Sequence, residues 1–328
     1  MRLPALLAVL ILLPALARAE GLAVSNQSSL ARAAALPVLG GPPVLAADES
    51  ETRVRLDWTS EYFERENARE ALTLDAETRR LALSYRRGFG GSIVPLQGWE
   101  WSAELPLLGS GGGMLDGVIE NWHELFGLPN GGREQAPRDR YRIRYVRDGE
   151  TLLDLEEGHT GLGDLRLGLG RALGEHWTLR AMLQLPTGDA GRLSGGHTGG
   201  ALWTDLTLPL GASERALLTL SGGVAAATTN GPLGSHQQPF AGLGGAALAL
   251  PLFAGMEALL QFNLHSALYR GSSLAPLDDA SGQLAMGLRI PVYGSRLTLG
   301  FQEDLIVNAS PDFSLHLGWD FGRSAGER

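Results

Sequence analysis

Charged and amide side chains recur at every second position in several apolar stretches of this chain. Successive residues of a β-strand point to opposite faces, so this spacing would gather the polar residues on one face of each strand. Acids and arginines that share a face can pair as a buried ionic network or form a polar lining. The residues that we predict to form such a lining are Arg53, Arg55, Glu100, Glu104, Arg180, Asp205, Gln261, Asn263 and Arg289.

The sequence offers little for nucleophilic or metal-dependent catalysis. A hydrolytic site needs a serine and a histidine within hydrogen-bonding reach, but adjacent His265 and Ser266 would point to opposite faces of a strand. Ser235 and His236 have no acid close by in the sequence. None of the 7 histidines forms an i,i+4 metal pair, and the chain contains 0 cysteines. We therefore predict no catalytic residue, no metal, no cofactor and no enzyme activity.

Most of the chain consists of alternating runs that would make strands. In the last run, Phe313, Leu315, Leu317, Trp319 and Phe321 alternate with smaller or polar residues. Such runs have roughly the 9–11 residues of a membrane-spanning strand, and short connections alternate with long glycine- and serine-rich ones. The pattern predicts an all-β fold, an antiparallel transmembrane β-barrel of about 12 strands, or about 14 if the hairpin at 140–155 joins the wall.

One predicted strand changes phase part-way along its length. Leu72 and Leu74 stand at even positions, whereas Leu81, Leu83 and Tyr85 stand at odd ones. A β-bulge is the usual cause of such a slip. We therefore expect a bulge between the two halves of this strand.

The N-terminus has the features of a secretory signal: Arg2, an apolar run from Leu3 to Leu16, and the small-x-small site Ala17–Ala19. The predicted division is a signal peptide at 1–19, an N-terminal periplasmic or plug segment at 20–50, the barrel at 51–321 and a C-terminal tail at 322–328. The predicted location is the outer membrane, with its lipid as a partner. The formal net charge of -9 argues against nucleic acid as a partner.

Residues 114–126 break the strand pattern and repeat at helical spacing, with apolar side chains on one side and acids on the other. Such a helix could lie over the barrel mouth, enter the lumen or rest on the membrane surface. We hypothesise that it caps or plugs the pore, with its acids facing the arginines that follow, namely Arg133, Arg138, Arg140, Arg142 and Arg144. An ordinary loop helix with solvated charges is the alternative.

Two motifs resemble a proteobacterial family of outer-membrane proteins whose function is unknown. They are Asn26–Leu30, followed by Ala35–Pro37, and the longer run Trp122–Arg133, with the sequence WHELFGLPNGGR. More distantly, Gly161–Leu165 and Leu185–Gly188 resemble motifs of outer-membrane carriers of fatty acids and aromatic hydrocarbons. From these motifs and the arginines that follow, the predicted binding residues are Asn26, Gln27, Trp122, His123, Phe126, Arg133, Arg140, Arg142 and Arg144.

The resulting functional expectation is passive transport or binding of a small molecule, with a hydrophobic ligand favoured. The alternative is a structural or surface-interaction barrel with a packed lumen, and a lipid-modifying enzyme is the least favoured reading. The aromatic end of the last strand, at Phe321, is similar to the signal that the barrel-assembly machinery recognises, so we expect that machinery as a partner during biogenesis.

Overall fold

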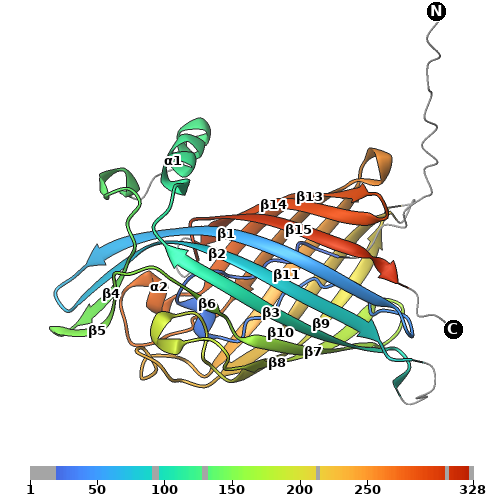
Figure 1. The fold of residues 1–328 in the computed structure, drawn as a ribbon, viewed down its shortest axis with the longest axis horizontal. Coiled ribbons are helices and arrows are strands. Elements are labelled where there is room, and N and C mark those ends of the chain that lie inside the picture. Colours follow the sequence, from blue (N-terminus) through green and yellow to red (C-terminus); the bar gives the residue numbers. More distant parts are fainter. Residues whose placement is uncertain (1–19, 91–95, 128–131, 212–214, 307–309, 325–328) are drawn as a thin grey trace, which may run out of the picture.

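The computed structural model describes residues 20–90, 96–127, 132–211, 215–306 and 310–324. Within these ranges, twelve antiparallel strands form a closed barrel, because β1 pairs with β15 on one side and β2 on the other (Figure 1). The predicted 12-strand barrel is therefore confirmed. Its strands are β1 (Ser50–Glu66), β2 (Glu70–Gly88), β3 (Trp99–Gly111), β7 (Leu165–Ala172), β8 (Trp177–Leu185), β9 (Gly199–Leu210), β10 (Ala216–Ala227), β11 (Phe240–Pro251), β12 (Glu257–His265), β13 (Ser281–Val292), β14 (Ser295–Ile306) and β15 (Phe313–Ser324).

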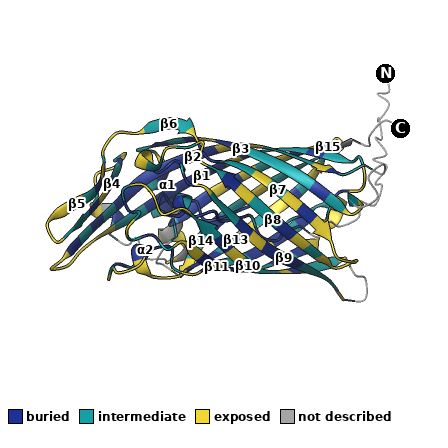
Figure 2. Ribbon diagram, turned by 90° about the horizontal axis from the view of Figure 1, so that it is seen from below, coloured by how far each residue is buried: buried dark blue, intermediate teal, exposed yellow. Residues whose placement is uncertain are grey.

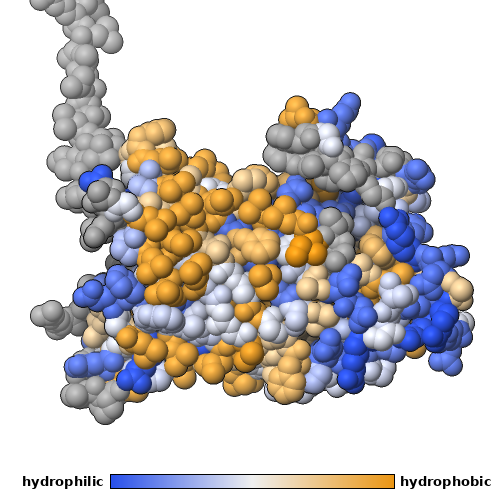
Figure 3. Space-filling view, turned by 180° about the vertical axis from the view of Figure 1, so that it is seen from behind, coloured by the Kyte–Doolittle hydropathy of each residue, from blue (hydrophilic) through white to orange (hydrophobic). Residues whose placement is uncertain are grey.

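The outer face of the wall is apolar where a membrane would surround it. Burial alternates along the strands (Figure 2), and hydrophobic residues cover one part of the surface while hydrophilic residues gather at one end (Figure 3). Exposed large apolar side chains on the outer face include Leu81, Leu83, Leu105, Leu107, Leu167, Leu183, Leu220, Val224, Leu260, Leu288, Leu299, Leu315 and Leu317. This distribution is the one expected of an outer-membrane barrel.

The alternative count of 14 strands is wrong. The hairpin of β4 (Arg142–Arg147) and β5 (Glu150–Leu155) pairs only with the far end of β2, where Glu70–Asp75 extends beyond the barrel. Short β6 (His159–Leu162) pairs with the end of β3. These strands therefore extend the sheet at the end of the barrel that carries the long loops (Figure 1).

The predicted bulge in β2 is also wrong. β1 and β2 pair without a register shift from Ser50 and Arg87 to Glu66 and Ala71. The apolar face changes because the surroundings change. Leu81 and Leu83 point outward in the apolar belt, whereas inward-facing Leu72 and Leu74 are buried in a core that the long loops and β4–β5 complete.

Residues 20–49, which we call the luminal segment, lie inside the barrel (Figures 1 and 2). Glu20 contacts Arg53 near one end of the barrel, Ser29 contacts Glu61 towards the other end, and Ala47 bridges back to Gly88. The segment therefore enters from the end with the short turns, reverses near the long loops and returns. Its short helix is η1 (Ala31–Ala33).

Small inward-facing residues make room for this segment. Leu22 is 1% exposed and packs in a cluster with Val24, Leu259 and Ala285. A Cβ at Gly287 would lie 2.9 Å from the Leu22 side chain, closer than such atoms approach one another. Some of the 45 glycines of the chain thus serve to accommodate a second layer of chain inside the wall.

The predicted amphipathic helix exists as α1 (Leu115–Phe126), between the third and fourth wall strands. It does not cap or plug the lumen, so that hypothesis is wrong. Leu115 and Ile119 are buried against Phe313, with Trp58 and Phe301 at the edge of the contact, and these aromatic side chains belong to the outer face of the wall. The aromatic strand ends offer the helix an apolar surface, while the luminal segment already fills the interior.

The remaining helices are short and lie in the connections: η3 (Arg133–Gln135), η4 (Ala190–Arg192), η5 (Phe253–Gly255) and α2 (Ala275–Asp278). Among the described helices, none is long and apolar enough to cross a membrane. The last strand, β15, continues to Ser324, past Phe321 where the sequence placed its end.

Candidate functional site

All nine predicted lining residues have side chains on the inner face of the wall. They do not surround an open pore. Instead they form clusters of paired charges that also bind the luminal segment. Two of them, Gln261 and Asn263, are hydrogen-bonded to each other at 3.1 Å, and Gln261 donates to the carbonyl of Leu39 at 3.5 Å.

Glu100 lies at the centre of the first cluster. It accepts hydrogen bonds from Arg86 at 2.6 Å and Arg180 at 2.9 Å, and from the backbone N–H of Leu45 at 2.9 Å. Arg180 also donates to Asp205 at 2.8 Å. The cluster therefore neutralises buried charges. It also binds the returning part of the luminal segment, at Leu45, to β3.

A second cluster surrounds Asp57 and Glu104. Arg55 and Arg80 each donate hydrogen bonds to both carboxylates. The distance to Asp57 is 3.2 Å from Arg55 and 3.1 Å from Arg80. Arg166 has one ion contact among the described residues, to Glu104 at 3.9 Å, and it lines a neighbouring pocket together with Asp164. Arg166 is therefore the least closely paired of the three arginines in this cluster.

A third cluster holds the start of the luminal segment. Glu20 pairs with Arg53, which also pairs with Asp320. Arg289 pairs with Glu257 at 2.6 Å and donates to the carbonyl of Glu20 at 3.1 Å. Paired charges of both signs are the usual way for a protein to bury so many ionisable groups.

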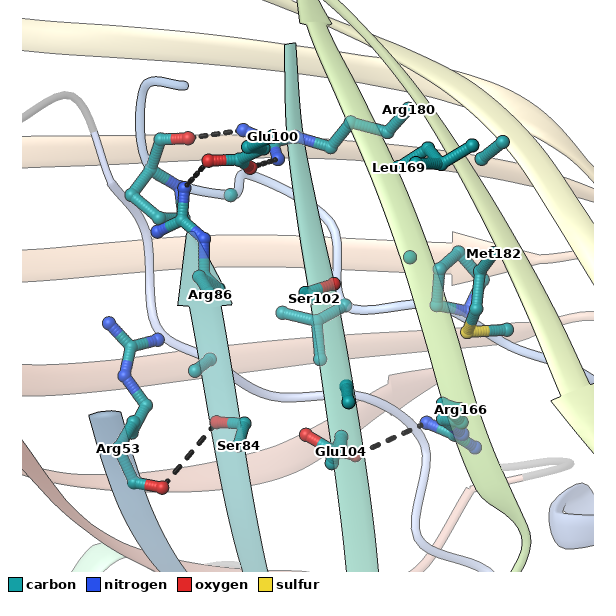
Figure 4. Close-up of a pocket in the computed structure, with 18 of the residues that line it drawn as sticks. Arg53, Ser84, Arg86, Glu100, Ser102, Glu104, Arg166, Leu169, Arg180 and Met182 are labelled. Carbon is teal, nitrogen blue, oxygen red and sulfur yellow. Dashed lines mark hydrogen bonds and ion pairs between the residues drawn. The ribbon is translucent and has the colours of Figure 1, made fainter. Parts of the chain in front are cut away.

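A cavity of about 150 Å³ remains between the luminal segment and the wall of β1, β2, β3, β7 and β8 (Figure 4). Arg166 and Ser102 contribute polar atoms to it, and Met182 contributes an apolar side chain. The indole of Trp203 on β9 and Val38 of the luminal segment also line it. The cavity therefore has both polar and apolar side chains in its lining, and it is our candidate functional site.

Two lining residues carry a buried donor without an acceptor among the residues that the structure describes, namely Nε of Arg166 and Nε1 of Trp203. Both atoms are enclosed by protein, so they do not open onto the cavity. The polar groups left to meet a ligand are the rest of the Arg166 guanidinium and the Ser102 hydroxyl. Gly168 leaves space for that hydroxyl, because a Cβ there would lie 2.2 Å from its Oγ.

Comparison with known proteins places the chain in a family. Residues 5–323 match the family described as "Protein of unknown function (DUF3187)". The chain belongs to this family. The predicted relationship to an outer-membrane family of unknown function is thereby confirmed, and no curated protein matches this DUF3187 chain.

Several solved structures resemble the DUF3187 chain. An outer membrane channel from Pseudomonas putida F1 is 12% identical, with a TM-score of 0.54, covering 85% of this chain and 97% of the channel. The translocator domain of the autotransporter NalP from Neisseria meningitidis has 10% identity, a TM-score of 0.46 and coverages of 83% and 87%. The P. putida toluene transporter TodX has 10% identity, a TM-score of 0.37 and coverages of 84% and 89%. The similarity to the first of these shows that the DUF3187 chain has the fold of an outer-membrane β-barrel.

The predicted binding residues of the DUF3187 chain do not meet in one site. Asn26 lies in the lumen, where its amide is 2.9 Å from Nε2 of His265, and Gln27 donates to Ser25 at 2.9 Å. The side chains of Trp122, His123 and Phe126 lie outside the described part of the structure, as do residues 128–131 of the longer motif.

The arginines that follow the helix are dispersed around the rim. Arg133 pairs with Asp116 of α1 and with Asp312, and Arg138 pairs with Glu120 at 2.6 Å. The helix acids thus meet two of the five arginines that were predicted to face them. Arg140 donates to Asp75 at 2.6 Å, Arg142 pairs with Asp154 at 3.1 Å, and Arg144 contacts Asp154 at 3.6 Å.

The two motifs that resemble those of hydrocarbon carriers interlock in the structure. The Asp164 carboxylate accepts from the backbone N–H groups of Gly188 at 2.9 Å, Gly196 at 2.7 Å and His197 at 3.2 Å. The Thr187 hydroxyl donates to the carbonyl of Gly163 at 2.7 Å. These residues therefore hold the long loop after β8 against the start of β7, which is a structural role.

Sequence reasoning missed several luminal residues. Arg80 and Arg86 alternate with Leu81 and Leu83, a parity that would have identified them, but the expected bulge obscured it. His316 contacts Asp57 at 2.7 Å, and its position opposite the apolar face of the last strand was the available signal.

Proposed function

We propose that this protein is an outer-membrane barrel that binds a small molecule between its luminal segment and its wall and allows passive transport of that molecule when the segment moves. The observation that carries this proposal is the cavity of about 150 Å³ that remains between the luminal segment and the wall, with Arg166 and Ser102 in its lining. A barrel whose lumen only had to be filled would leave no such space beside its own plug, because protein interiors are normally close-packed.

The proposed resting state is closed. The luminal segment is hydrogen-bonded to the wall along both arms, through Glu61 at its turn and through Glu100 and Arg289 near its ends. A plug held by side-chain contacts rather than by the barrel hydrogen bonds can shift without breaking the wall. Transport would then depend on that shift.

A structural barrel with a packed lumen is the second candidate. The extensive pairing of luminal charges favours it, since paired networks often serve only stability. The two candidates differ in whether the luminal segment has to move.

Immobilising the segment separates them. The Cβ of Ala35 lies 2.8 Å from the place that a Cβ would occupy at Gly199. A small shift of about 1 Å would bring cysteines at these positions to disulfide distance, and the chain has 0 native cysteines to interfere. The double variant Ala35→Cys with Gly199→Cys is compared in liposomes with the single variant Ala35→Cys, using entry of small aromatic solutes.

The proposal expects entry with the single variant, none with the oxidised double variant, and recovery on adding reductant. Equal entry with the oxidised and reduced double variants would contradict it. Wild-type protein that neither admits nor binds any small probe would establish the packed structural barrel instead.

We propose in addition that export uses the signal at 1–19, with cleavage after Ala19, and that assembly machinery reads the aromatic end of β15. Support for the second point comes from β15 itself, which closes the barrel against β1. Phe321→Ala should reduce the assembled, heat-modifiable form on gels, whereas removal of 325–328 should not. Unimpaired assembly of Phe321→Ala would refute this role.

A further inference from the structure

We propose that the cavity beside Arg166 binds the carboxylate of a small, single-ring organic acid. This inference rests on the proposed function and names the ligand class of that site. Each of its elements, namely charge, donors, apolar contacts and size, comes from a different feature of the cavity.

Arg166 is a weakly paired cation at this cavity. Of the three arginines around Asp57 and Glu104 it has the least contact, at 3.9 Å from Glu104, and Asp164 lines a neighbouring pocket with it. A bound carboxylate would give the guanidinium a close partner. Arginine is also suited to carboxylates because its planar fork matches their two oxygens.

Polar groups of two lining residues can meet the carboxylate. The Arg166 guanidinium has only the long contact to Glu104 among the described residues, and the Ser102 hydroxyl lines the same cavity. In Figure 4, Arg166, Ser102 and Met182 all border the cavity from neighbouring strands. A carboxylate accepts hydrogen bonds and donates none, so it fits a set of free donors better than an ammonium group or an amide does.

The remaining walls favour a compact apolar body. Met182, the ring of Trp203, and Pro37 and Val38 of the luminal segment form the apolar side. The cavity volume is about 150 Å³, and a cavity of roughly 150 Å³ is known to accommodate benzene. A long-chain fatty acid is several times larger than benzene, so the size excludes it and leaves single-ring acids.

Binding to the detergent-solubilised protein, measured by calorimetry with benzoate and its neutral isostere benzamide, tests this inference. We expect benzoate to bind at least tenfold more tightly than benzamide. Arg166→Gln should weaken benzoate binding at least tenfold and leave benzamide unchanged, while Arg166→Lys should recover part of the loss. Arg171→Gln is the matched control, because Arg171 lies on the same strand, is exposed, and stacks on Trp99.

A second variant keeps the test informative if Arg166→Gln fails to fold, as judged by heat-modifiable gel mobility. Ser102→Ala removes a hydroxyl from the cavity lining, and it should weaken benzoate binding several-fold. Equal affinity for benzoate and benzamide, or benzoate affinity that neither variant changes, would overturn the inference.

The result also separates this inference from the proposed function. If toluene binds or enters liposomes while benzoate does not, the organic-acid assignment is wrong and the transport proposal stands. If no probe binds or enters, both are wrong.

Discussion

The turn of the luminal segment offers the most direct way to loosen it by a single substitution. The buried carboxylate of Glu61 accepts from the Ser28 hydroxyl at 3.0 Å, from the backbone N–H of Ser29 at 3.1 Å, and from the Ser29 hydroxyl. Each hydrogen bond to a charged group contributes about 1.5–3 kcal/mol. Glu61→Gln keeps one acceptor oxygen but turns an NH₂ donor towards other donors.

If glutamine preserves about half of that stabilisation, anchoring of the turn weakens by about 2–4 kcal/mol, which is roughly a 30- to 1000-fold increase in opening. Hydrogen exchange followed by mass spectrometry would detect this as faster exchange of peptides that contain Ser28 and Ser29. Glu64→Gln is the matched control, since Glu64 lies on the same strand, is half exposed, and pairs with Arg140 at 3.0 Å. Exchange at the turn that is the same in both variants would refute the role given to Glu61.

Three further predictions follow from the rim of the barrel. Arg133→Ala should lower the free energy of unfolding in urea by about 2–3 kcal/mol, because it removes a buried guanidinium that pairs with two partly buried acids, Asp116 and Asp312. Arg138→Ala, at an exposed arginine, should cost less than about 1 kcal/mol, and equal losses would contradict the assignment. Ile119→Ala should destabilise the docking of α1 by about 2–4 kcal/mol, whereas Leu125→Ala should cost less than about 0.5 kcal/mol. The rate at which a protease cleaves the helix measures this difference. A larger effect of Leu125→Ala would contradict the contact described for α1. Asp164→Asn should speed proteolysis of the loop after β8 several-fold, because it removes a carboxylate that accepts hydrogen bonds from three backbone N–H groups. An unchanged cleavage rate would show that other contacts hold the loop.

The barrel could be predicted because its physical signal is local. Alternation places large apolar residues outward and polar or small residues inward, and the nine predicted lining residues lie inside for this reason. The same rule misled at β2, since Leu72 and Leu74 lie beyond the membrane belt, where the interior rather than the exterior is apolar. Periodicity reports which face is buried, but not what buries it.

The candidate site could be predicted only in part. Arg166 follows from strand parity, but its weak pairing depends on how Arg55 and Arg80 share two acids across three strands. The position of α1 depends on aromatic residues, Trp58 and Phe313, that are far away in the sequence. The helix itself was predicted correctly, but its location was not. Amphipathicity shows that a helix has an apolar side, but not which surface that side will contact.

Single-channel conductance in planar bilayers tests the central claim most directly, namely that the luminal segment closes the barrel. The comparison is between the wild type and a variant that lacks residues 20–41, with correct assembly of both checked by heat-modifiable mobility. We expect small and infrequent openings for the wild type and a sustained, several-fold larger conductance for the variant. A variant that is assembled but as silent as the wild type would contradict it and show that the wall's own side chains fill the lumen.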